Sequence, residues 1–298
     1  MIAIIPDVHG RQFWKDVIPR KDEFEKIIFL GDYLDPYLHE FEKDPMMSQF
    51  AEIYETISNR VLNNFKEIIE FKKQNPDRVV LLLGNHDCTY AISTSICSCR
   101  CDRLNYKKIC ELFEQNKDLF TLAYYVKIED KEYVFSHSGL HREYAVSVFG
   151  EEVEDSILRA VNEFNYHYKE ETYGVLDSLS RCSWYRGGWE KTGSIVWADV
   201  REWVKGQIFD EGEELVEYDA YQIFGHTQLS SDPIVTDKFA CLDCRRAFRF
   251  ENGKFYELSG EEVPVKNLSK INNYMEKYFN KTNKRGKCHT CPGGHLPK

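Results

Sequence analysis

The sequence predicts a mixed α/β fold, and two observations lead to that prediction. Short apolar runs alternate with amphipathic stretches through the first half of the 298 residues, which is the pattern of layered α/β domains. Several of these runs end in a cluster of Asp, His or Asn, and ligands of such sheets bind beyond the carboxyl ends of the strands. We expect one large domain over residues 1–260, followed over 261–298 by a C-terminal helix and a polar tail with Cys and His.

The first half of the chain supplies buried strands and amphipathic helices. Three apolar runs are expected to be strands, over 1–6, 26–30 and 78–83. A helix is expected over 47–74, where apolar residues recur at helical spacing until Asn75-Pro76 ends them. A second helix is expected over 102–117, and a hairpin over 121–136 with its polar tip at Glu129-Asp130.

The second half is expected to be richer in strands. Helical residues over 151–170 lead into a long aromatic loop over 180–193, of the length that often carries function. Four more strands are expected, over 194–198, 220–224, 234–242 and 247–258. The last two are expected to form a meander, with Asn252-Gly253 as a turn. A closing helix is expected over 265–283.

Composition and charge exclude several classes of protein. Hydrophobic residues make up 42% of the chain, which is enough for a substantial core. We find neither a run of about eighteen apolar residues nor a signal peptide, so we expect a cytoplasmic protein without membrane contact. The formal net charge of -10 argues against a general nucleic-acid binder. It leaves small phosphorylated substrates open, because bound metal ions reverse the local field.

Five expected strands end in a polar cluster. The clusters are Asp7-Val8-His9, Gly31-Asp32, Gly84-Asn85-His86-Asp87, Ser136-His137 and Gly225-His226. Carboxylate, imidazole and amide groups without a thiolate suit a pair of divalent ions such as manganese, iron or zinc. Two such ions can activate a hydroxide and stabilise the leaving oxygen of a phosphoester. The glycines let the backbone approach closely.

In their order, these clusters resemble the blocks of the calcineurin-like metallophosphoesterases over roughly the first 245 residues. The resemblance implies a four-layer sandwich of two mixed β-sheets flanked by helices, with the active site at the C-terminal ends of the strands. It also implies six metal ligands: Asp7 and His9 for the first ion, Asp32 as the bridge, and Asn85, His137 and His226 for the second. His86 would be the general acid, with Asp35 orienting its imidazole.

Two departures from the family pattern concern the metal site and the phosphate. Gln228 stands where many members have a further histidine, which resembles the branch of serine/threonine protein phosphatases and diadenosine tetraphosphatases. Pro36 stands where that branch usually carries a phosphate-binding arginine. Arg181 and Arg186 are our candidates for this role, because guanidinium groups bind phosphate oxygens in pairs. The alternative is that both are solvated loop charges.

The favoured function is a metal-dependent phosphomonoesterase or protein phosphatase, in which a hydroxide activated by two metals attacks the phosphorylated substrate. A nucleotide or dinucleoside polyphosphate hydrolase is the alternative, because Trp184, Tyr185 and Trp189 could stack on a base. A metal-binding scaffold without activity is a hypothesis of another class. No nucleophile elbow or phosphate-binding loop motif occurs in the chain.

The remaining histidines and cysteines carry weaker signals. His39, His141 and His167 are expected at the surface or at helix caps, although His141 could line the pocket. The pairs Cys241/Cys244 and Cys288/Cys291 could hold a structural zinc or remain free thiols. The alternating cysteines at 97, 99 and 101 are expected to form a loop near the pocket, with a metal or redox role as the alternative.

Overall fold

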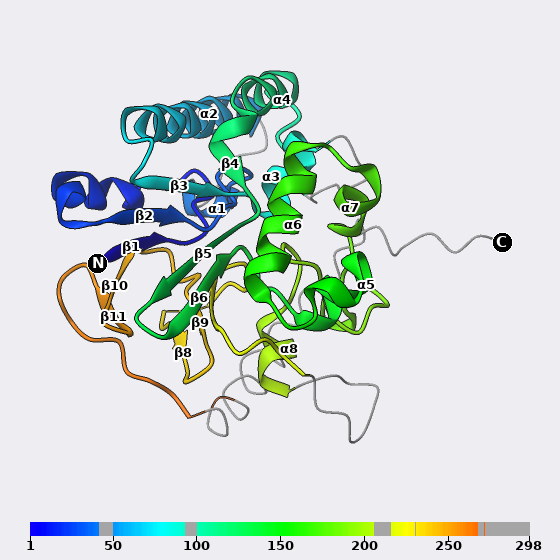
Figure 1. Cartoon of the computed structure of the whole chain (residues 1–298). Helices are drawn as coiled ribbons and strands as arrows, with labels where there is room; N and C mark the ends of the chain where they lie inside the picture. The colour runs from blue at the N-terminus through cyan, green and yellow to red at the C-terminus, as the bar shows by residue number, and fades with distance from the viewer. Residues whose placement is uncertain (42–49, 93–99, 206–215, 230, 268–270, 272–298) are drawn as a thin grey trace.

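The computed structural model describes residues 1–41, 50–92, 100–205, 216–229, 231–267 and 271. Two mixed β-sheets occupy the centre of the molecule, and helices lie on their outer sides (Figure 1). No helix among these residues is long and apolar enough to cross a membrane. The closing helix expected over 265–283 and most of the predicted C-terminal region, 261–298, lie outside the described residues.

The first sheet has six strands in the order β11-β10-β1-β2-β3-β4. Its strands are β1 (Ile2–Ile5), β2 (Lys26–Phe29), β3 (Val79–Leu82), β4 (Phe120–Thr121), β10 (Phe248–Glu251) and β11 (Lys254–Glu257). β1 to β4 run parallel, whereas β10 is antiparallel to β1 and to β11. The carboxyl ends of β1, β2 and β3 therefore lie at one edge of this sheet.

The second sheet has five strands in the order β5-β6-β7-β9-β8. Its strands are β5 (Ala123–Ile128), β6 (Lys131–Ser136), β7 (Tyr221–Phe224), β8 (Ile234–Val235) and β9 (Phe239–Cys241). β5 and β6 form the predicted hairpin, and β6, β7 and β9 run parallel. The carboxyl ends of β6 and β7 therefore lie next to each other at one edge of this sheet.

The helices lie on both outer sides of the sheets. α2 (Phe50–Gln74) and α4 (Tyr106–Gln115) cover the first sheet, and α6 (Ile157–Lys169) packs beside β5 of the second (Figure 1). The others are η1 (Phe13–Glu23), α1 (Leu38–Phe41), α3 (Asn85–Ala91), η3 (Lys117–Leu119), α5 (Arg142–Phe149), η4 (Glu151–Val153), α7 (Tyr173–Ser178), η5 (Trp184–Arg186) and α8 (Val200–Lys205).

Alternation along the strands divides the core into two clusters, because successive side chains point to opposite faces. Ala3 and Ile5 of β1 belong to the cluster that includes Phe65 of α2. Ile2 and Ile4 belong to the cluster between the two sheets, together with residues of β6, β7 and β9. Each sheet is thus buried on both faces. The predicted α/β sandwich of two mixed sheets flanked by helices is confirmed.

Two of the predicted strands are wrong. Residues 194–198 form a turn, because the Ser194 carbonyl oxygen accepts the amide groups of Trp197 and Ala198 at 2.9 Å. The Ser138 hydroxyl also accepts the Ala198 amide at 2.9 Å, so this apolar run is fixed by a distant loop. Residues 234–242 form β8 and β9 instead of one strand, because Thr236 turns the chain by accepting two amide groups at its Oγ1.

The predicted meander is also corrected. β10 and β11 do form a hairpin with Asn252-Gly253 as its turn, and both turn residues have positive φ angles. However, β9 belongs to the second sheet and β10 to the first. The short segment between them crosses from one sheet to the other, and it carries Asp243 and Cys244, both buried.

Candidate active site

All five predicted polar clusters follow a strand at the same end of the two sheets. Asp7 follows β1, Asp32 follows β2, and Asn85 begins α3 directly after β3. His137 and His226 follow β6 and β7 of the second sheet. The two parallel groups of strands therefore bring together residues that are more than two hundred positions apart.

Asp32 is shared by two clusters of potential metal-binding atoms. One cluster comprises His9, Asp32 and His86, and the other comprises Asp32, His137 and His226, with the atoms of each within 4.8 Å of one another. Asp32 Oδ2 lies 3.4 Å from His9 Nε2 and 3.5 Å from His137 Nε2. This arrangement places one carboxylate between two groups of potential metal-binding atoms.

Backbone carbonyl groups orient the imidazoles of this centre. His9 Nδ1 donates to the Leu34 carbonyl oxygen at 2.8 Å, and His137 Nδ1 donates to that of Leu30, also at 2.8 Å. The Nε2 atoms of both rings are left to face Asp32, and such hydrogen bonds fix the tautomer of metal-binding histidines. His137 Nε2 also lies 3.0 Å from Asn85 Oδ1 and 3.0 Å from His226 Nδ1.

Unusual backbone geometry places these side chains. His9, Asp32, Asp35 and His226 have φ angles of 44°, 53°, 56° and 62°. Such angles are uncommon outside glycine and concentrate at functional sites. A Cβ atom on Gly84 would lie 2.1 Å from Asp32 Oδ1, and one on Gly225 would lie 2.0 Å from Asp7 Oδ2. Only glycine allows these carboxylates to sit so close to the neighbouring strand end.

The electrostatics of the centre suit a bound divalent cation. Burial, and then the charge of Asp32, raise the pKa of Asp7 to about 8. Burial opposes ionisation of Asp32 as well, but His137, His86 and His9 outweigh it and bring its pKa to about 2. Burial lowers the pKa of His9 and of His226. Neutral imidazoles around buried carboxylates are the donor set that a divalent cation requires.

One unpaired ring nitrogen also fits a metal. His226 Nε2 is buried and has no hydrogen-bond partner among the described residues. A buried polar atom of this kind is costly unless a partner such as an ion or water satisfies it. The backbone amide of His226 meanwhile donates to both oxygens of Asp7 at 3.0 Å, which ties the second sheet to the first. The residues present therefore fit the pair of ions expected from the sequence.

Asp87 is a supporting residue to which the sequence analysis assigned no role. Its carboxylate accepts hydrogen bonds from the backbone amides of Asp32 at 2.6 Å, Gly84 at 2.9 Å and Tyr33 at 3.0 Å. Asp87 is fully buried at the third position of α3. It holds the turn that carries Asp32 against the turn that carries Asn85. The sequence offered one sign of this role, because Asp87 is an acidic residue in the first turn of a helix, where such residues often accept backbone amides.

The predicted acid and its partner are in contact. His86 Nδ1 donates to Asp35 Oδ2 at 2.7 Å. The Tyr90 hydroxyl donates to the other oxygen, Asp35 Oδ1, at 2.5 Å. The His86 ring lies edge-on to that of His9, with centroids 5.0 Å apart. The His86 ring is thereby held beside the metal-binding cluster with Nε2 directed away from Asp35.

Of the two predicted phosphate-binding arginines, Arg186 lies beside the centre. Arg186 Nη2 donates to the Thr227 hydroxyl at 3.1 Å, and its Nε lies 2.7 Å from Asp199 Oδ2. Its charge contributes to the lowered pKa of His226, after burial. The Arg181 guanidinium instead donates to Ser147 of α5 at 2.9 Å.

A third arginine, which the sequence analysis did not single out, lies at His86. Arg100 Nη2 is 3.2 Å from His86 Nε2. Its guanidinium stacks on the Tyr37 ring, 3.6 Å from the centroid. Arg100 stands fourteen residues after His86, beyond a segment outside the described residues, so no local pattern marks it.

The other histidines and cysteines have different environments. His39 is exposed and His167 is partly buried, whereas His141 is fully buried between Glu202 and Glu217, which corrects the prediction for its side chain. His141 occupies the N-cap position before α5, as one of the two predictions had it, but its side chain makes no capping hydrogen bond. Cys241 and Cys244 are free and buried, and burial raises the pKa of both thiols. The possible zinc partners at 288 and 291, and Cys97 and Cys99, lie outside the described residues.

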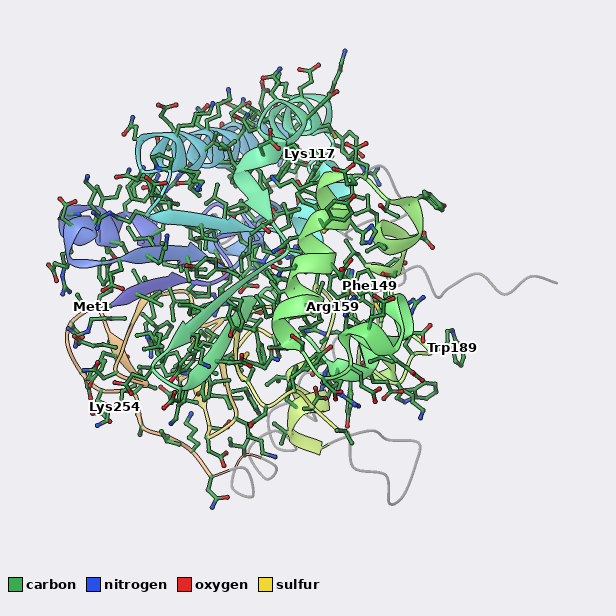
Figure 2. The ribbon with its side chains drawn as sticks, in the orientation of Figure 1. Met1, Lys117, Phe149, Arg159, Trp189 and Lys254 are labelled. Atoms are coloured by element: carbon green, nitrogen blue, oxygen red, sulfur yellow. The ribbon has the colours of Figure 1, made fainter. Side chains whose placement is uncertain are left out.

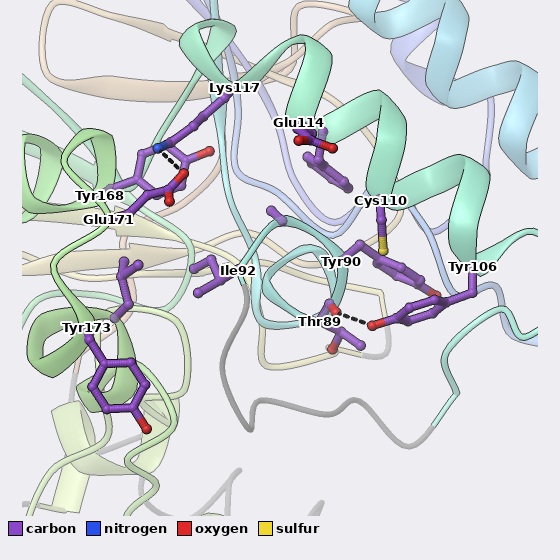
Figure 3. A pocket seen from close by; sticks show the side chains of 13 residues that line it. Thr89, Tyr90, Ile92, Tyr106, Cys110, Glu114, Lys117, Tyr168, Glu171 and Tyr173 are labelled. Carbon is purple, nitrogen blue, oxygen red and sulfur yellow. Dashed lines mark hydrogen bonds and ion pairs between the residues drawn. The ribbon is translucent and has the colours of Figure 1, made fainter.

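A cavity of about 430 Å³ adjoins α3 but belongs to a different place. Thr89, Tyr90, Tyr106 and Cys110 line one part of it, and Lys117 and Glu171 form an ion pair at the other (Figure 3). None of the predicted metal ligands lines this cavity. Tyr90, one of its lining residues, donates a hydrogen bond to Asp35 Oδ1.

With this geometry in place, the fold and site define a metal-dependent phosphoester hydrolase. The model of the calcineurin-like phosphoesterases matches residues 1–229. The chain belongs to the calcineurin-like phosphoesterase family, as its ordered motifs predict.

The chain is also similar to two solved phosphatase structures. A cold-active protein-tyrosine phosphatase of a psychrophilic Shewanella species is 15% identical, over 88% of this chain and 80% of that one, with a TM-score of 0.38. A protein serine/threonine phosphatase from Saccharomyces cerevisiae is 13% identical, over 80% and 65% of the two chains, with a TM-score of 0.37. The comparison with curated proteins gives no match.

Proposed function

We propose that this chain hydrolyses phosphomonoesters, small or protein-borne, with two divalent cations, manganese first among them. Asp7, His9 and Asp32 would hold one cation, and Asp32, Asn85, His137 and His226 the other. The observation that supports this proposal is the position of Asp32, whose carboxylate lies between His9 and His137 and belongs to both clusters. Gln228 supplies no imidazole to the first site, so that site keeps room for water or substrate.

Two cations bound here would neutralise the phosphoryl oxygens and lower the pKa of a water molecule for in-line attack at phosphorus. The chain's own residues supply the rest of the reaction. His86 is placed to give a proton from Nε2 to the leaving oxygen, because its Nδ1 is engaged by Asp35. Asp87 and the two close glycines keep the carboxylates in position, so little reorganisation is needed during the reaction.

The loop that carries Arg186 favours a second candidate, a nucleotide or dinucleoside polyphosphate hydrolase. Trp184 and Trp189 are 45% and 76% exposed, with ring centroids 5.7 Å apart. Trp189 projects from the surface of the molecule (Figure 2). Exposed indoles next to a phosphate site can stack on a base. A phosphopeptide and a dinucleoside polyphosphate offered together, with release of each product followed, distinguish the two candidates.

The proposal is tested by titrating manganese into metal-free protein. We expect two equivalents to bind and hydrolysis of an aryl phosphate to rise with the second. Asp32→Asn should lose both equivalents and activity, whereas Asp16→Asn on the exposed side of η1 should lose neither. A protein that binds both equivalents and hydrolyses no phosphoester would instead be the metal-binding scaffold.

A further inference from the structure

We propose that Arg100 binds a phosphoryl oxygen of the substrate beside His86. This inference rests on the proposed hydrolysis of a phosphoester at the same site. Pro36 directly follows Asp35, so the turn that orients His86 provides no cationic side chain of its own at that position. Arg100 comes from a different segment of the chain and reaches the other ring nitrogen of the imidazole, with Nη2 3.2 Å from Nε2.

Arg100 differs from the other two arginines at the site in its partners. Arg11 forms a pair with Glu40 at 2.7 Å, and Arg186 forms one with Asp199 at 2.7 Å. Among the described residues, no carboxylate pairs with Arg100, and its Nε is buried without a hydrogen-bond partner. A guanidinium has five N–H donors and no acceptor. Arg100 therefore has donors left for an anion, whereas Arg11 and Arg186 each already engage a carboxylate, which Arg245 and Arg201 share with them.

The surroundings hold Arg100 in place without a counter-ion. Its guanidinium lies on the face of Tyr37, 3.6 Å from the centroid, and the Tyr37 ring meets that of His9 edge to face at 5.1 Å. An arginine stacked on an aromatic ring keeps its in-plane N–H groups available. The same ring thus connects the guanidinium to the first metal-binding cluster.

A hydrogen-bond chain also fixes the backbone next to Arg100 relative to the acid. The Tyr90 hydroxyl donates to Asp35 Oδ1 at 2.5 Å and accepts the Asp102 amide at 2.5 Å. The buried Asp102 carboxylate accepts the Ser58 hydroxyl from α2 and the Leu104 amide at 3.0 Å. Only Cys101 lies between this anchor and Arg100. The orientation of His86 and the position of Arg100 therefore depend on the same tyrosine.

The contact between Arg100 and His86 changes when an anion binds. A guanidinium only donates hydrogen bonds, and a general acid must also donate, so an anion between the two groups supplies the acceptor that both require. An oxyanion inserted between the two groups can accept from both of them. One phosphoryl oxygen would then receive Arg100 while the leaving oxygen faces His86 Nε2. In this arrangement both Arg100 and His86 would donate to the phosphoryl group of the bound substrate.

The test compares Arg100→Ala and Arg100→Lys with the matched control Arg103→Ala, which removes an exposed arginine three residues away. Each manganese-loaded protein is assayed with an aryl phosphate for kcat and KM. Calorimetry measures the binding of inorganic phosphate, and metal content is determined separately. We expect Arg100→Ala to weaken phosphate binding and raise KM by about 10- to 100-fold, as for a charge-assisted hydrogen bond. Arg100→Lys should restore part of the loss, and Arg103→Ala should match the unmodified protein.

The two proposals fail in different ways. If Arg100→Ala binds phosphate as tightly as the unmodified protein, Arg100 is not a phosphate ligand. If kcat falls while phosphate affinity is unchanged, Arg100 only positions His86, and the proposal is overturned. If the unmodified protein hydrolyses no phosphoester, the proposed function fails, but phosphate binding to the metal-loaded protein still compares Arg100→Ala with Arg103→Ala.

Discussion

His86 Nδ1 donates a hydrogen bond to Asp35 Oδ2 at 2.7 Å, and both side chains are buried beside the predicted metal centre. Asp35 has a φ angle of 56°, an uncommon conformation for a residue other than glycine. Its second oxygen accepts the Tyr90 hydroxyl. The imidazole is thereby held in one orientation before substrate arrives, as a general acid requires.

Removing this imidazole should separate chemistry from metal binding. We expect His86→Ala to lower kcat by about 10²- to 10⁴-fold, the range for loss of a general acid, while both manganese equivalents remain. Steady-state kinetics and metal analysis of the same sample check this. His39→Ala, which alters an exposed histidine of α1, is the control and should keep full activity. Unchanged turnover in His86→Ala would remove His86 from the reaction.

Gly225→Ala should disturb the first metal site without unfolding the protein. The added Cβ would lie 2.0 Å from Asp7 Oδ2, so the carboxylate must move. We expect manganese affinity to fall about 10- to 100-fold, as when a group that positions a ligand is changed. Calorimetric titration measures it.

The control for this variant is Gly174→Ala in α7, where an added Cβ meets no atom within 4 Å. We expect that change to leave metal affinity unchanged and to stabilise the helix by about 0.5–1 kcal/mol. Equal manganese affinities in the two variants would contradict the close approach of Gly225 to Asp7.

Asp87→Asn should destabilise the turn that carries Asp32. The carboxylate accepts three backbone amides, and an asparagine amide would turn an NH₂ group toward at least one of them. We expect the free energy of unfolding to fall by about 1.5–3 kcal/mol. Urea unfolding checks this, with Asp118→Asn at an exposed site as the control, expected within about 0.5 kcal/mol of the unmodified protein. A loss of the same size in both variants would argue against this role for Asp87.

His141 should make stability depend on pH in the alkaline range. Burial alone would lower its pKa, but Glu217 and Glu202 raise it from 6.5 to about 10. The folded state therefore holds a proton that the unfolded chain releases above its ordinary pKa. The stabilisation is complete below about pH 6.5 and is lost as the pH rises to about 10, by at most about 1.4 kcal/mol per pH unit.

This dependence is measured as the difference between the unmodified protein and His141→Gln. Urea unfolding from pH 6.5 to 10 should show the largest difference in unfolding free energy at the acidic end. A difference that stays constant with pH would show that His141 carries no extra proton in the folded state.

Much of the fold follows from local pattern. β1, β2, β3, β7 and the hairpin of β5 and β6 coincide with apolar runs, because their side chains are buried and their ends carry turn residues. The run at 194–198 has the same composition and is a turn, because Ser138 in a distant loop accepts the Ala198 amide. Its apolar side chains are buried without strand pairing. The apolar pattern of residues 194–198 therefore predicts that they are buried, but it does not predict which groups accept their backbone hydrogen bonds.

The sequence by itself determined the family, the α/β class and the order of the polar clusters, because Asp, Asn and His directly after apolar runs are visible without coordinates. The family resemblance already implied Asp32 as the bridge, and the structure added its distances to His9 and His137. The tertiary structure alone showed that Asp87 holds the turn of Asp32 and that Arg100 reaches His86. These contacts link residues at strand ends and in loops that are far apart in the chain. The distances between them depend on how the two sheets pack against each other, and residue spacing along the sequence does not determine that packing.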